Sequence, residues 1–202
     1  MNKWAHILTS ALLGFYFLTW CWFHISTFFV VNGLWRLIEG FIIVQLFLIS
    51  IIFFSRKPAL STSWSQWDAG ICTIAIFYVF FLEPNGPSNP HLAPIIVQVA
   101  GSLIIMGSYL SLNRSTGILP AKRAIKTNGL YCFIRHPMYA GYQIFIFGYI
   151  LNNLSLHNII VFSVGTTAQI LRILSEERFL DRDPDFIDYK ASVKYRLLPY
   201  IF

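Results

Sequence analysis

The chain contains long runs of apolar residues that suit the interior of a membrane. A helix needs about 20 apolar residues to cross the hydrocarbon core of a bilayer. Of the 202 residues, 56% are hydrophobic and only 12% are charged, so the chain has too little polar surface to coat a soluble globule. The sequence therefore predicts an all-α, polytopic integral membrane protein.

Six apolar runs, each bounded by charges or by Pro/Gly turns, fit membrane-spanning helices. Four precede a basic loop, and two follow it, separated by the turn-like stretch NNLSL. The runs cover residues 5–30, 35–54, 68–83, 94–113, 137–152 and 157–174. Because a short link makes consecutive helices antiparallel neighbours, the last two runs are expected to form a helical hairpin.

Basic residues collect in the second half of the chain. Eleven of the 15 lysines and arginines follow residue 113, in a loop from 114 to 135 and between 172 and 196. Since cations are enriched in cytoplasmic segments, both regions and the N-terminus are predicted to face the cytoplasm, either of a bacterial inner membrane or beside the endoplasmic reticulum. This topology accounts for the net charge of +6 without a nucleic-acid partner.

The chain is expected to have two functional regions. Residues 1–113 hold the four N-terminal spans, and residues 114–202 hold the basic loop, the hairpin and a C-terminal amphipathic helix. Polar residues concentrate in the second region, so the active site is expected there. Three isolated cysteines are interpreted as small buried hydrophobes, and we expect no metal site.

The stretch FIRHPMYAGYQ, residues 133–143, sets polar side chains at the start of an apolar helix. Pro137 suits the first helical position, which puts His136 near the N-cap and Tyr139 in the first turn. Backbone N–H groups and the helix dipole would then join Arg135 and His136 in a site for an anion. The alternative is that these two side chains only anchor the helix at the headgroup layer.

A second polar group lies where the last apolar helix ends. Arg172 and Glu176 are four residues apart, so one interpretation is an ion pair along a single helix. The other is that a carboxylate of Glu176 or Glu177 faces the Arg135–His136 corner across the hairpin. A site divided in this way would match a ligand with both a carboxylate and an ammonium group, such as an amino-acid moiety.

The C-terminal segment also has two interpretations. Phe186, Tyr189 and Val193 recur at helical spacing, which predicts an amphipathic helix on the membrane surface. The segment from Tyr195 to Pro199 could in addition fold back over a bound ligand.

Several of these motifs together resemble a known family. TNGLYCFIRHPMYAGY, a hairpin of about thirty-five residues, paired glutamates and a terminal R-x-x-P are similar to the C-terminal half of the isoprenylcysteine carboxyl methyltransferase and phospholipid N-methyltransferase superfamily. The resemblance covers roughly residues 100–202. Residues 1–95 match only in being predicted membrane helices.

The resemblance implies S-adenosylmethionine as the methyl donor and names the residues that would hold it. These donor-binding residues are Arg123, Ala124, Ile125, Lys126, Tyr131, Arg135, His136, Pro137, Met138, Tyr139 and Glu176. Thr116 matches a donor-pocket glutamine of the isoprenylcysteine enzymes, and Arg172 matches the family's substrate-side arginine. Glu176 and Glu177 remain alternatives for the glutamate that contacts the donor.

The expected reaction is methylation of a lipophilic or lipid-borne acceptor. A carboxylate acceptor needs no general base, and Arg172 would position it, so an isoprenylcysteine-like carboxylate is the preferred substrate. A phospholipid amine or a small lipophilic amine or thiol must lose a proton, which would ask Glu176, Glu177 or His136 to act as base. An NADPH-dependent sterol-type reductase and a non-enzymatic membrane scaffold are the remaining alternatives.

Overall fold

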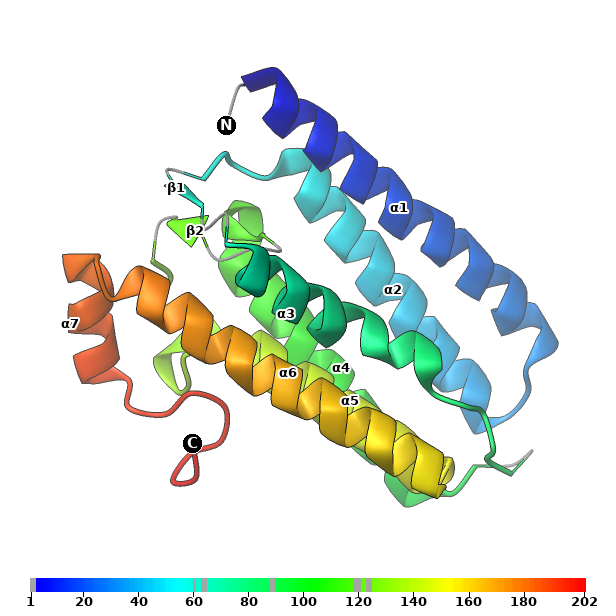
Figure 1. Ribbon diagram of the computed structural model, residues 1–202. Coiled ribbons are helices and arrows are strands. Elements are labelled where there is room, and N and C mark those ends of the chain that lie inside the picture. The colour runs from blue at the N-terminus through cyan, green and yellow to red at the C-terminus, as the bar shows by residue number, and fades with distance from the viewer. Residues whose placement is uncertain (1–2, 60, 63–64, 88–89, 118–120, 123–124) are drawn as a thin grey trace.

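The computed structural model describes residues 3–59, 61–62, 65–87, 90–117, 121–122 and 125–202, and its described part is mostly helical (Figure 1). The α helices are α1 (Lys3–Val30), α2 (Leu34–Ser55), α3 (Gln66–Phe77), α4 (Leu92–Leu112), α5 (Pro137–Asn152), α6 (Leu156–Leu180) and α7 (Pro184–Ser192). Short 3₁₀ helices are η1 (Tyr78–Phe81), η2 (Asn113–Ser115) and η3 (Gly129–Cys132). Strands β1 (Ser61–Thr62) and β2 (Ala121–Lys122) form one antiparallel pair, which the all-α prediction did not contain.

Each of the six predicted runs is helical. The run at 68–83 is divided between α3 and η1, and the run at 157–174 continues as α6 to Leu180, six residues further than predicted. Within the described residues, four helices are long and apolar enough to cross a membrane, namely those over Trp4–Val30, Leu34–Ser55, Leu92–Ser115 and Leu156–Leu180. Gln66–Phe81 is a shorter apolar segment, and α5 has 16 residues, so six crossings stay a prediction.

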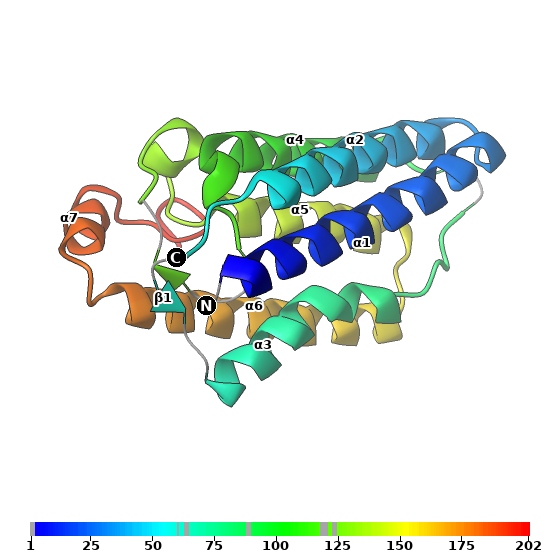
Figure 2. The ribbon, with the colours of Figure 1, turned by 90° about the horizontal axis from the view of Figure 1, so that it is seen from above.

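The connections that carry the basic residues gather at one end of the helix bundle. Strands β1 and β2, helix α7 and both marked chain ends lie at that end, whereas the α1–α2, η1–α4 and α5–α6 connections lie at the other (Figures 1 and 2). The predicted loop after α4 and the C-terminal segment therefore meet in space, although about sixty residues separate them.

Helix α5 is held against α4 by glycines. A Cβ atom added to Gly101 would lie 2.5 Å from the backbone N of Phe145, and one added to Gly141 would lie 2.9 Å from the backbone N of Ile105. Small residues allow this close backbone contact between membrane helices. Helix α6 packs more along α3 than along α5, the helix with which the sequence paired it in a hairpin.

The main apolar core lies directly beside the start of α5. It joins α2, α4, α5 and α6 through Ile49, Ile52, Phe53, Ile105, Tyr109, Met138, Tyr139 and Ile173. Met138 and Tyr139 belong to the first turn of α5, so this core fixes the position of the residues that precede them.

The glycine contact predicts different results for two Gly→Ala variants. Gly101→Ala should lower the stability of the fold by about 1–3 kcal/mol, because overpacking forces α4 and α5 apart. Gly70→Ala in α3 is the control, since a Cβ there would meet no atom within 4 Å. Thermal melting in detergent measures both; equal melting of Gly101→Ala and the wild type would contradict the close packing.

Candidate active site

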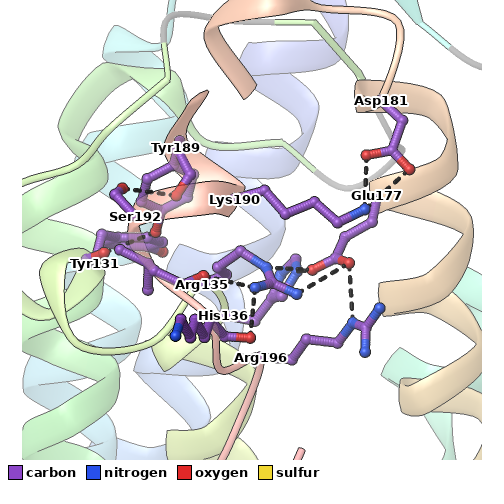
Figure 3. A network of polar contacts seen from close by, with 11 residues as sticks. Tyr131, Arg135, His136, Glu177, Asp181, Tyr189, Lys190, Ser192 and Arg196 are labelled. Atoms are coloured by element: carbon purple, nitrogen blue, oxygen red, sulfur yellow. Dashed lines mark hydrogen bonds and ion pairs between the residues drawn. The ribbon is translucent and has the colours of Figure 1, made fainter. Parts of the chain in front are cut away.

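The start of α5 has the geometry that its sequence predicts. His136 is the N-cap residue, Pro137 occupies the first turn, and the residues Arg135 and His136 are only 5% and 8% exposed. A snorkelling cation keeps its charged group in water, so burial of Arg135 argues against the anchor interpretation. Both residues instead point into the protein toward α6 (Figure 3).

Glu177 of α6 is the centre of a buried ion-pair cluster. Its Oε1 accepts hydrogen bonds from Arg135 Nε at 2.7 Å and His136 Nε2 at 3.1 Å. Its Oε2 accepts from Arg196 Nε at 2.9 Å and from Arg135 Nη2 at 3.3 Å. The Glu177 side chain is 3% exposed, so its charge is balanced by these partners rather than by bulk water (Figure 3).

Arg135 also binds the C-terminal segment, which we define as residues 193–202. Its Nη1 donates to the carbonyl oxygens of Val193 at 2.6 Å and Lys194 at 2.8 Å. The backbone N–H groups of Arg135 and His136 donate to the carbonyls of Tyr195 and Arg196, both at 2.9 Å. This segment does return to the start of α5, where Arg135 binds it, but none of residues 193–202 lines the pocket described below, so its coverage of a bound ligand stays a prediction.

Glu176 takes part in a different set of contacts. Its Oε2 accepts a hydrogen bond from the Tyr139 hydroxyl at 2.9 Å. The Tyr139 ring stacks on the His136 ring with centroids 5.5 Å apart, and the Arg172 guanidinium lies 4.8 Å from the centroid of the Tyr139 ring. Tyr139 therefore links the His136 corner to Glu176 and to the buried Arg172.

These contacts resolve the two predictions made for the paired glutamates. The Arg135–His136 corner is paired with Glu177, whereas Glu176 lies beside Tyr139. The carboxylate that faces the corner is therefore Glu177, which pairs with the cation of Arg135 itself, and a ligand site divided between the corner and Glu176 stays a prediction.

A pocket opens between the start of α5, the end of α6, α7 and the loop after α4. It is lined by Leu112, Ser115, Thr116, Gly117, Ala121, Ile125, Lys126, Tyr131, Arg135, His136, Met138, Tyr139, Glu176, Leu180, Phe186 and Tyr189. Eight of the eleven predicted donor-binding residues are in this set, as is Thr116. Pro137, Arg172 and Glu177 are not in the lining, and Arg123 and Ala124 lie outside the described residues.

Helix α7 forms a wall of the pocket. Phe186 and Tyr189 are buried and pack with Leu180 and Val193 in a small apolar cluster. The Tyr189 hydroxyl donates to the Tyr131 carbonyl at 2.7 Å, and burial raises the pKa of Tyr189, so the phenol remains a donor at physiological pH. The amphipathic pattern of this segment thus reflects packing against the protein on its buried face.

Sequence reasoning missed seven of the lining residues. Phe186 and Tyr189 were assigned to an amphipathic helix but not to the site, although their spacing was the available signal. The other five, Leu112, Ser115, Gly117, Ala121 and Leu180, are small or apolar and carry no chemical pattern. They become neighbours only through the tertiary fold.

The pocket offers groups of both charges next to aromatic faces. Glu176 supplies a carboxylate, Lys126 an ammonium group, and Tyr131, Tyr139 and Phe186 supply rings. A carboxylate and an ammonium group can bind the two charged ends of an amino-acid moiety, and aromatic rings stabilise a cation near their faces. The described residues therefore fit a ligand that combines an amino acid, a sulfonium and a flat base.

A comparison with known families covers the region that supplies most of this pocket. Residues 89–183, from just before α4 to just before α7, match the family model of phospholipid methyltransferases. This part of the chain belongs to the superfamily of small membrane methyltransferases. The predicted family is confirmed, and so is the prediction of an enzyme, because this is a family of S-adenosylmethionine-dependent membrane methyltransferases. No curated protein matches the chain.

Replacement of Glu177 should release the C-terminal segment. In Glu177→Gln, Arg135 and Arg196 keep their charges but lose the carboxylate between them, and breaking a buried ion pair costs about 3–5 kcal/mol. We expect lower thermal stability in detergent and faster limited proteolysis within residues 193–202.

The neighbouring variant Glu176→Gln is the matched control for this experiment. It removes the same charge one residue away and keeps the Glu177 cluster intact, so it should leave the proteolysis rate of the C-terminal segment near that of the wild type. Equal proteolysis of the wild type and Glu177→Gln would contradict the role of this cluster.

Proposed function

We propose that this membrane methyltransferase binds S-adenosylmethionine in the pocket between α5, α6 and α7 and methylates a lipophilic acceptor. One observation supports the proposal best. The Glu176 carboxylate lines a pocket together with the rings of Tyr131 and Tyr139, and these residues lie in the region that matches the methyltransferase family. The match supports this activity over the sterol-type reductase and the scaffold.

The residues of the pocket suggest how the donor is held. Glu176 is the proposed partner of the donor's ammonium group, and Lys126 is the proposed partner of its carboxylate. Tyr131 and Phe186 offer faces for the adenine, and Tyr139 offers one for the sulfonium. When bound, the donor supplies a methyl group on a carbon that is already activated.

Arg135, His136 and Glu177 act in this proposal as positioning residues. Four of the five side-chain N–H groups of Arg135 donate to Glu177 and to the C-terminal segment, and His136 donates to Glu177 while stacking on Tyr139. Their proposed contribution is a fixed orientation of Tyr139 and of the first turn of α5. Correct alignment of the reacting groups can supply most of the rate of an in-line displacement.

The preferred acceptor is an isoprenylcysteine-like carboxylate. Arg172 is 6% exposed, and its guanidinium lies over the Tyr139 ring, one helical turn before Glu176. A buried arginine can orient an acceptor carboxylate and offset the cost of removing it from water. An ionised carboxylate attacks without a base, so the proposal assigns no proton transfer to the glutamates.

A phospholipid amine is the second candidate, because the matching model is that of phospholipid methyltransferases. A protonated amine must lose its proton before attack. Glu176 is the proposed base in that case, since its carboxylate lines the pocket, whereas Glu177 is enclosed by two arginines and the His136 ring.

We also propose that the pocket opens on the cytoplasmic side of the membrane. It lies at the end of the bundle where the basic connections gather, which is the side that cations favour. Residues 114–202 would then carry most of the donor site, and residues 1–113 would hold it in the membrane.

Calorimetric titration of the detergent-purified protein with S-adenosylhomocysteine tests the donor site. We expect micromolar binding, and a loss of about tenfold or more in His136→Ala and in Glu176→Gln, because each variant removes a charged or stacking group at the pocket. His157→Ala and Glu83→Gln, at the opposite end of the bundle, make the same changes away from the pocket and should bind normally. Binding of NADPH instead of S-adenosylhomocysteine would overturn the proposal.

The chemical stability of the product identifies the acceptor. Membranes that contain the protein are incubated with methyl-labelled S-adenosylmethionine, and the lipid and protein extracts are treated with alkali. A carboxyl methyl ester releases volatile labelled methanol, whereas an N-methyl group stays on the headgroup and its label is not volatile. Arg172→Gln should reduce the alkali-labile label, and retention of all label after alkali would overturn the carboxylate proposal in favour of the amine.

A further inference from the structure

A second pocket lies between the ends of α1, α2 and α4. Its described lining includes His6, Ser10, Phe54, Arg56 and Arg114, and it shares no residue with the pocket described above. Three of these side chains can carry a positive charge, and no Asp or Glu is present in the described lining. The pocket is therefore suited to an anion.

Two hydroxyl groups hold the Arg56 side chain in position. Arg56 Nε donates to Ser10 Oγ at 2.8 Å, and Arg56 Nη2 donates to Thr9 Oγ1 at 2.9 Å. The Ser10 hydroxyl donates its own proton to the His6 carbonyl, and the Thr9 hydroxyl donates to the carbonyls of Ala5 and His6, so both oxygens are free to accept from Arg56. These contacts orient the guanidinium at the pocket.

Two backbone carbonyls fix the other members of the pocket. His6 Nε2 lies 3.2 Å from the Arg56 carbonyl oxygen, which can only accept, so the ring proton is on this nitrogen. Arg114 Nε donates to the Ser55 carbonyl at 2.5 Å, and the N–H of Lys57 donates to the Arg114 carbonyl at 2.9 Å. Arg114 is thereby held beside Arg56 although it follows a different helix.

The position of the pocket indicates the source of the anion. Arg56 follows Ser55, the last residue of one candidate membrane span, and His6 lies two residues after the start of another. Ile7 and Phe54 line the same pocket and are 47% and 44% exposed, and Leu8 and Ile51 are exposed beside them. Fixed cations thus meet apolar surface at the boundary of the membrane, as they would around the phosphate and acyl chains of a lipid.

We propose that this pocket, which we name the α1–α2 headgroup pocket, binds the phosphate of an anionic phospholipid. Arg56 and Arg114 bind the phosphate oxygens, His6 lies beside them, and the acyl chains follow the exposed apolar faces of α1 and α2. The preference of cations for the cytoplasmic side would account for basic residues at this end of the bundle. It would not account for a pocket there, or for an arginine that two hydroxyl groups hold in one orientation. The inference is independent of the methyl acceptor.

Native mass spectrometry of the detergent-purified protein tests this site, with dioleoyl phosphatidylglycerol as the probe and no methyl donor present. The wild type should bind this lipid about tenfold more tightly than dioleoyl phosphatidylcholine, because each basic contact near a membrane surface favours an anionic lipid. The double variant Arg56→Gln/Arg114→Gln should lose that preference. Equal binding of the two lipids by the wild type would overturn the proposal.

Two controls distinguish a lipid-binding pocket from general charge attraction and from a site for free phosphate. The double variant Arg178→Gln/Arg182→Gln removes two positive charges from exposed positions at the same end of the bundle. It should keep the preference for phosphatidylglycerol over phosphatidylcholine. If it lost that preference as fully as Arg56→Gln/Arg114→Gln, general electrostatic attraction would replace the pocket as the explanation. Glycerol 3-phosphate is the soluble probe, and its binding as tightly as the lipid would overturn a lipid site in favour of a free phosphate site.

A single variant covers the case in which loss of Arg56 weakens the fold. Arg114→Gln removes an exposed side chain whose contact is to a backbone carbonyl, so thermal melting should change little. It should still lower binding of phosphatidylglycerol about threefold to tenfold. Unchanged lipid binding in this variant would overturn the assignment of Arg114.

Discussion

The arrangement of the candidate active site depends on one buried carboxylate. Glu177 binds Arg135 and His136 from the start of α5 and Arg196 from the C-terminal segment. An ionised group in this position is costly unless every partner is present, so its charge requires three separate parts of the chain to meet. The same requirement fixes which face of α6 points toward α5, and it leaves Glu176 and Tyr139 together at the pocket.

The close packing of α4 and α5 gives this cluster a rigid support. Glycines bring the two helices into backbone contact, and the apolar core that includes Met138 and Tyr139 adjoins the first turn of α5. A methyltransferase relies on alignment more than on acid–base chemistry, so a stiff platform beneath the pocket suits the proposed reaction. The family match begins just before α4, which is the first helix of this platform.

Sequence reasoning located the helices and most of the pocket, and it failed where tertiary packing decides. Apolar runs of membrane length gave the helices, and Pro137 correctly marked the start of α5. The end of α6 was missed because its last turn is charged. The choice between Glu176 and Glu177 could not be made, since adjacent helical residues point about 100° apart and only the rotation of α6 against its neighbours selects one. The strands β1 and β2 are two residues each, too short for any periodicity.

The bonds between Arg135 and the C-terminal segment also set a time order for biogenesis. The carbonyls that Arg135 binds belong to residues translated almost sixty residues after it. The helices through α6 are therefore synthesised while the start of α5 still lacks these partners. Until then, Arg135 and His136 make their hydrogen bonds with water or with lipid headgroups. The site is complete only when residues 193–196 have left the ribosome.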